Sequence, residues 1–147
     1  MGIDFSTMSV LTKFLHLNHL FLSKRIKEID PALSKPHAGI IIHMLPDTPY
    51  KVGELAKMLD VTPGAITQAT KPLIKEGYLL RENGEDLRTV YLKLTKKGVD
   101  LRGKILNEFK KLNNTMLDFL TDNEKKIFLS LLQKITDELE KRIEDYD

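Results

Sequence analysis

The sequence predicts a mainly helical α+β fold, in which long helices at both ends of the chain flank a small central unit of short helices and a β-hairpin. Three observations support this prediction. Apolar residues recur every three or four positions in residues 6–29 and again in residues 96–143. Residues 53–69 have the spacing of two short helices joined by a tight turn. Residues 78–94 contain two short strand-like segments separated by polar turn residues.

Composition limits the class of protein. The 147 residues are 41% hydrophobic and 30% charged, which is typical of one soluble globular domain with one core. The absence of cysteine excludes disulfides and thiolate metal sites. The first six residues lack the positive region of a secretory signal, and the apolar run at residues 40–45 is too short to span a bilayer. We therefore expect a soluble, cytoplasmic protein with no membrane partner.

Charge is distributed unevenly along the chain. The net charge is only +2, but residues 48–98 carry nine Lys and Arg against six Asp and Glu, whereas residues 121–147 carry five against eight. A basic middle and an acidic end suggest that the middle faces a polyanion. The alternative is an ordinary solvated surface.

The first predicted helix covers about Ser6 to Ile29 and is apolar on more than one side. Such a helix must be buried on more than one side, against its own chain and against a partner. Asp30 and Pro31 end it. A second, short helix is expected to begin at residues 34–36 and to end at Leu45.

Two helices are predicted in the last third of the chain, one from about Lys96 to Phe119 and one that begins after Thr121. Thr121 and Glu124 have the spacing of a capping box. Together with the first helix, these helices present more apolar surface than the central unit can cover. A homodimer accounts for that surface, and a monomeric helical bundle is the alternative.

The segment from Gly53 to Ala69 predicts a helix-turn-helix. A small residue at Ala56 lets the second helix cross closely, and Asp60 lies where the chain turns sharply, often through positive φ. Thr62 is placed to cap the second helix, and Pro63 suits its first position because no hydrogen bond is lost there.

The outer face of this second helix has residues suited to a DNA major groove. Ala65 can contact a thymine methyl group, Gln68 can pair with adenine, and Lys71 suits a phosphate. The other outward positions are Gly64, Thr67 and Lys75. Pro72 lies inside the same helix, so we expect a kink or an early end of regular helix between Gln68 and Pro72.

A hairpin is predicted directly after the helix-turn-helix. Gly77 ends the helix, residues 78–82 and 89–94 form strands, and residues 83–88 are polar and rich in turn residues. A hairpin in this position makes the central unit a winged helix.

At this point the sequence resembles the MarR family of transcriptional regulators. The resemblance rests on Lys75-Glu76-Gly77-Tyr78-Leu79, on the Asp-x-Arg of Asp86-Leu87-Arg88, and on Leu94-Thr95-Lys96-Lys97-Gly98. The motifs span about residues 52–98, and the layout matches over essentially the whole chain. The resemblance implies a triangular homodimer, with residues 1–32 and 99–147 as the dimerisation region and residues 36–98 as the DNA-binding winged helix. It also implies that Arg88 enters a minor groove and that Asp86 braces the wing, by pairing with Arg88 or with backbone amides.

The expected function is therefore a sequence-specific regulator, acting as a repressor, whose dimer binds a pseudo-palindromic operator in double-stranded DNA. The expected DNA-binding residues are Thr62, Pro63, Gly64, Ala65, Thr67, Gln68, Lys71, Lys75, Arg88 and Thr89. No phosphate-binding glycine loop or nucleophile motif occurs, so we expect no enzyme activity and no cofactor.

Three further possibilities concern ligands and partners. Many relatives in the family bind a small aromatic or phenolic effector, and the candidate pocket residues here are Leu17, Arg25, Ile40, His43 and Met44. A zinc-responsive regulator is an alternative because His16 and His19 are three residues apart on a helix. A winged helix used as a protein-interaction module is another, since fold does not fix function.

Overall fold

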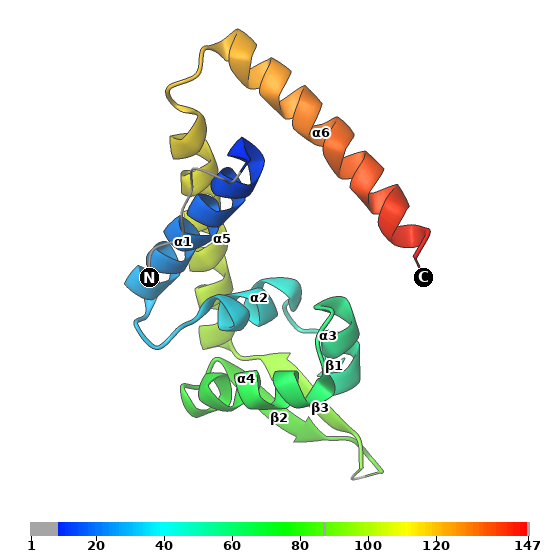
Figure 1. The fold of residues 1–147 in the computed structure, drawn as a ribbon. Coiled ribbons are helices and arrows are strands. Elements are labelled where there is room, and N and C mark those ends of the chain that lie inside the picture. Colours follow the sequence, from blue (N-terminus) through cyan, green and yellow to red (C-terminus); the bar gives the residue numbers. More distant parts are fainter. Residues whose placement is uncertain (1–8, 87, 147) are drawn as a thin grey trace, which may run out of the picture. The chain divides into compact units, whose positions relative to one another are not determined.

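The computed structural model describes residues 9–86 and 88–146. They form two compact units, Met1–Phe109 and Lys110–Asp147. The elements in chain order are α1 (Val10–Ile29), α2 (Lys35–His43), β1 (Tyr50–Lys51), α3 (Val52–Met58), α4 (Pro63–Lys75), β2 (Leu79–Asn83), β3 (Val90–Leu94), α5 (Lys96–Leu117) and α6 (Asp122–Glu144) (Figure 1). The mainly helical fold with a small antiparallel sheet confirms the predicted winged helix.

The ends of the long helices follow from their capping residues. The Ser9 hydroxyl accepts a hydrogen bond from the Thr12 amide at 3.2 Å, and α1 begins after it. The predicted start at Ser6 lies outside the described residues. Helix α2 ends at His43 and α5 at Leu117, each two residues before its predicted end. At the end of α2 the reason is local, because Met44 has extended backbone angles.

The helix-turn-helix forms as predicted. Asp60 has a φ of 51°, and the Thr62 hydroxyl accepts from the Ala65 amide at 3.1 Å. Pro63 is the first residue of α4, and Gly77, with a φ of 74°, follows the helix at its end. These predictions are confirmed.

Helix α4 runs through Pro72 to Lys75, so of the two predicted effects of this proline the early end is wrong. The predicted kink stays a prediction. The proline removes one amide donor, but Ile66 and Leu73 are 2% and 1% exposed and anchor the helix on both sides of it. The next turn closes normally, because the Glu76 amide donates to the Pro72 carbonyl at 2.9 Å.

The sheet has the strand order β1-β3-β2, and both pairings are antiparallel. The short strand β1 was not predicted. In this register Leu92 lies opposite both Tyr50 and Arg81. Figure 1 shows that the hairpin of β2 and β3 projects beyond α3 and α4, and this hairpin forms the wing.

The core of the first unit lies between the sheet, α4 and the helices around them. Its most deeply buried side chains are Ile26, Ile40, Ile41, Met44, Leu55, Ile66, Leu73, Leu79, Leu92 and Ile105. Val61, directly after the turn of the helix-turn-helix, lies outside this core: it is 45% exposed and borders a cavity. The Tyr78 hydroxyl donates to Asp30 Oδ2 at 2.7 Å, which ties the end of α1 to the start of β2.

Helix α6 belongs to the second unit and has no buried residue. Its predicted capping box is present: the Glu124 amide donates to the Thr121 hydroxyl at 3.3 Å, and the Thr121 amide donates to Glu124 Oε2 at 2.8 Å. Its exposed apolar side chains are Ile127, Phe128, Leu129, Leu131, Leu132, Ile135, Leu139 and Ile143. None of the helices within residues 9–86 and 88–146 is long and apolar enough to cross a membrane.

Candidate nucleic-acid interface

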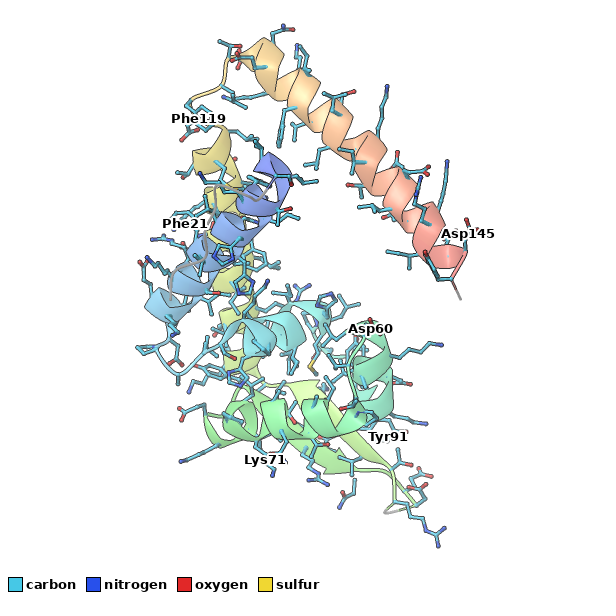
Figure 2. All side chains as sticks on the ribbon, viewed as in Figure 1. Phe21, Asp60, Lys71, Tyr91, Phe119 and Asp145 are labelled. Atoms are coloured by element: carbon cyan, nitrogen blue, oxygen red, sulfur yellow. The ribbon has the colours of Figure 1, made fainter. Side chains whose placement is uncertain are left out.

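One face of α4 packs on the core and the other is open to solvent. Ile66, Thr70 and Leu73 form the buried face, while Ala69 and Ile74 are half-buried. Figure 2 shows Lys71 on the side of α4 that faces away from α2. The predicted DNA-binding residues on this helix are all exposed: Pro63, Gly64, Ala65, Thr67, Gln68, Lys71 and Lys75, together with Thr62 at its cap.

The start of this exposed face is small and uncrowded. A Cβ atom added at Gly64 would meet nothing closer than the Thr62 hydroxyl oxygen, at 3.9 Å. The glycine is therefore not required by packing within the chain. With Ala65 beside it, the helix backbone can come close to another surface at this point.

Some polar side chains of α4 already form hydrogen bonds within the helix, and others do not. The Thr67 hydroxyl donates to the Pro63 carbonyl at 3.0 Å, and the buried Thr70 hydroxyl donates to the Ile66 carbonyl at 2.8 Å. Among the described residues, the side chains of Gln68, Lys71 and Lys75 have no hydrogen-bond or ion-pair partner. Their amide and ammonium groups are therefore available to a ligand, whereas a phosphate contact by Thr67 would require its hydroxyl to turn away from Pro63.

The wing is braced by Asp86. Its Oδ1 accepts from the amides of Thr89 at 2.9 Å and Arg88 at 3.2 Å, and its Oδ2 accepts from the Thr89 hydroxyl at 2.9 Å. These hydrogen bonds, led by the one from the Thr89 amide, lower the pKa of Asp86. Of the two bracing modes predicted, the structure shows the one through backbone amides. Leu87, between Asp86 and Arg88, lies outside the described residues.

Asp86 leaves the exposed Arg88 guanidinium without an ion-pair partner among residues 9–86 and 88–146. Arg88 lies in the hairpin turn, after the end of β2, and the half-buried Thr89 follows it. The turn of the wing therefore presents the cation of Arg88, and the exposed face of α4 presents those of Lys71 and Lys75.

A groove of about 390 Å³ lies between α4 and the wing. Its cationic lining residues are Lys51, Lys71, Arg81 and Arg88. Lys51 and Arg81 were not among the predicted binding residues. Sheet pairing brings them to this groove, since β3 pairs with both of their strands: Lys51 lies opposite Tyr91, and Arg81 lies opposite Leu92. Both belong to the basic middle of the chain, which was the only sequence signal for them.

The five residues predicted to form an effector pocket lie in different environments. Leu17 is exposed, while Ile40 and Met44 belong to the core. Arg25 is bonded to Glu28 at 2.5 Å and to Glu108 at 2.6 Å, and His43 Nδ1 lies 2.8 Å from the Gly39 carbonyl oxygen.

Only Ile40 of these five borders the mainly apolar cavity of about 530 Å³ that α1, α2 and α4 form with Leu59 and Val61, which follow α3. The polar side chains on its rim are His19 and Lys35, whose Nδ1 and Nζ atoms are 2.7 Å apart. Over the part of the chain that the structure describes, no three His, Asp or Glu side chains come together as metal ligands.

Known proteins with a similar sequence or a similar fold are transcriptional regulators. A comparison with protein-family models found no match. The chain is 28% identical over 131 residues to the uncharacterized HTH-type transcriptional regulator YwhA of Bacillus subtilis, covering 85% of this chain and 88% of that protein.

Two solved structures have the same fold. The MarR protein from Peptoclostridium difficile has a TM-score of 0.71 and 26% identity, covering 97% of this chain and 94% of that one. The reduced form of MarR from E. coli has a TM-score of 0.71 and 21% identity, covering 88% and 98%. The predicted resemblance is confirmed.

Proposed function

We propose that the chain is a DNA-binding transcriptional regulator of the MarR type, which acts as a homodimer on a pseudo-palindromic operator. Its fold and its sequence similarity to HTH-type regulators support the proposal. The observation that carries the proposal is the exposed face of α4, where small residues adjoin unpaired polar and basic side chains, with an unpaired arginine on the wing beside it.

Different side chains are suited to different parts of the DNA. Gln68 has a free carboxamide and suits an adenine edge, which offers one donor and one acceptor. Gly64 and Ala65 let the helix approach the bases. Lys71 and Lys75 suit phosphates and supply affinity without sequence preference. Arg88 suits a narrow minor groove, whose negative potential attracts a guanidinium.

A dimer lets two copies of this interface bind one DNA duplex at the same time. Two copies of α4 can occupy successive major grooves about one helical turn apart, which requires an inverted repeat in the DNA. The unburied apolar side chains of α6 support a second copy as the partner. Occupation of such an operator would block transcription, so the proposed role is repression.

An effector is a second element of the proposal. The cavity bordered by Ile40 has an apolar wall and a cationic residue, Lys35, at its rim, which suits a small aromatic acid. Such a ligand would release DNA only if it bound the DNA-free geometry more tightly than the DNA-bound one. Thermal-shift measurements with a panel of aromatic acids test this element, and the absence of any shift would count against it.

The test of the main proposal is selection of bound duplexes from a random library at near-physiological salt, followed by binding assays on the selected site. We expect an enriched inverted repeat. Arg88→Ala and Gln68→Ala should weaken binding to that repeat by about tenfold or more, the effect of about 1–3 kcal/mol for a specific contact. Lys71→Ala should weaken all duplexes about equally.

The contrast between these variants is the control. If Lys71→Ala changed sequence preference and Arg88→Ala did not, the assigned roles would be wrong. A folded dimer that enriched no sequence would contradict the proposal and would favour a winged helix that binds protein partners.

A further inference from the structure

We infer that Arg81 is a further DNA-binding residue, which holds the backbone phosphate that passes between the recognition helix and the wing. The inference rests on the proposed function and adds to it a residue outside α4 and outside the wing tip. It follows from the position of Arg81 in the sheet, from the charges around it and from its lack of a partner among the described residues.

The sheet register places Arg81 on the side of the sheet that faces α4. Arg81 lies opposite Leu92, and side chains that lie opposite one another in an antiparallel pair share a face. Leu92 is 1% exposed and belongs to the core, whereas Arg81 is exposed. Arg81 therefore lies on the core-facing side of β2 and lines the groove whose other wall is formed by Thr70, Lys71 and Ile74 of α4.

All the charged side chains that line this groove are positive. They are Lys51, Lys71, Arg81 and Arg88, and no Asp or Glu that the structure describes lines it. The Lys51 ammonium lies 5.9 Å from the centre of the Tyr91 ring. The Arg81 guanidinium has no ion pair and no hydrogen bond to any residue in 9–86 and 88–146. Cations of one sign in a shared groove repel one another and attract an anion from outside the chain.

The position of this protein groove, between α4 and the wing, indicates that the anion is a DNA phosphate. When α4 lies in a major groove and the wing lies in the adjacent minor groove, the strand between them presents its phosphates to the space that separates the two elements. A guanidinium can donate two parallel hydrogen bonds to such a phosphate. Base edges are not presented at that point, so Arg81 contributes affinity and register but no sequence preference.

The salt dependence of binding to the selected duplex tests this inference. Each phosphate neutralised by a side chain contributes about 0.9 to the slope of log K against log salt concentration. Arg81→Gln should therefore reduce the slope by about 0.9 for each protomer that contacts DNA, or about 1.8 for a dimer. As a consequence, the affinity difference from the wild-type protein should shrink by about tenfold between 50 and 200 mM salt.

Two other variants separate a phosphate contact from other effects. Arg81→Lys keeps the charge and should keep the wild-type slope, with weaker binding because the paired hydrogen bonds are lost. Lys27→Gln removes an equal charge from the last turn of α1, which does not line the groove, and should leave the slope unchanged. Thermal unfolding of each variant verifies that the domain remains folded.

The outcomes are distinguishable. Wild-type binding with an unchanged slope in Arg81→Gln would overturn the inference and leave the proposed function intact. Equal slope losses in Arg81→Gln and Lys27→Gln would also overturn it, because the effect would then come from the overall charge. If the wild-type dimer bound no duplex, the proposed function would fail, and the inference with it.

Discussion

At the scale of single residues, the junction of β3 and α5 depends on Gly98. A Cβ atom added there would lie 2.0 Å from the carbonyl oxygen of Tyr78, which is backbone and has little freedom to move. Thr95 acts at the same junction: its hydroxyl accepts from the Gly98 amide at 3.0 Å and donates to the Gly77 carbonyl at 2.6 Å. The Leu-Thr-x-x-Gly motif thus joins the end of the recognition helix, the sheet and α5 at one close contact.

Replacement of this glycine should destabilise the fold. We expect Gly98→Ala to lower the free energy of unfolding by about 1–3 kcal/mol, the usual cost of overpacking, although alanine favours a helix. Gly103→Ala on the same helix is the matched control, because a Cβ atom there would have no neighbour within 4 Å. It should raise stability by up to about 1 kcal/mol. Denaturant unfolding measures both, and equal stability of the two variants would contradict the role given to Gly98.

At the scale of elements, α2 begins with a cap that depends on a histidine. His37 Nδ1 accepts a hydrogen bond from the Ser34 amide at 3.1 Å, which is possible only when this nitrogen carries no proton. Burial lowers the pKa of His37 below its ordinary value, so folding favours the neutral ring. Helix α2 supplies Ala38, Ile40 and Ile41 to the core. Protonation of His37 therefore weakens the packing of this helix on the core as well as the hydrogen bond at its start.

The sign of the resulting pH dependence follows from linkage. Since the folded pKa is lower than the unfolded value of about 6.5, the contribution of His37 is fully present above pH of about 6.5 and is lost as the pH falls through the folded pKa. We expect thermal unfolding at pH 5 to occur at a lower temperature than at pH 7.5. His37→Gln keeps an acceptor at the third helical position but cannot titrate, so its loss between these pH values should be smaller. An identical loss in both proteins would assign the effect to other groups.

Elements with local signals were predictable from the sequence, and elements that depend on distant pairing were not. Thr62, Pro63 and Gly77 fix the ends of α4 through their own backbone and side-chain chemistry, and the structure confirms all three. Strand β1 has two residues and forms only because β3, about forty residues later, pairs with it. No local pattern indicates such a strand.

The candidate site also has a part that could be predicted from local sequence and a part that depends on distant strand pairing. The exposed face of α4 follows from helical spacing, so its residues could be chosen from the sequence alone. Lys51 and Arg81 join Lys71 and Arg88 only through the three-stranded sheet, and no spacing along the chain brings them together. The early end predicted at Pro72 is wrong because the burial of Leu73, which follows from the tertiary fold, offsets the cost of one lost hydrogen bond.

At the scale of the whole molecule, the exposed apolar residues of α6 are the main feature that the single chain leaves unexplained. Ile127, Leu131, Ile135, Leu139 and Ile143 recur every four residues and are each more than half exposed. Apolar side chains in such a row normally lie in an interface. Phe128, Leu129 and Leu132 widen this row, and charged residues predominate on the rest of the helix, which gives α6 the two-sided character of a dimerisation helix.

A charge placed on this row should therefore separate the proposed dimer. We expect Ile135→Glu to be monomeric in light scattering at low micromolar concentration, where the wild-type protein should be dimeric, because an unpaired carboxylate is costly inside an apolar interface. Ser130→Glu adds the same charge on the opposite side of α6, between Lys126 and Lys134, and should remain dimeric. The monomer should lose preference for an inverted repeat, since it can occupy one half-site at a time. A dimeric Ile135→Glu protein, or a monomeric wild-type protein, would show that the row of α6 is not the dimer interface.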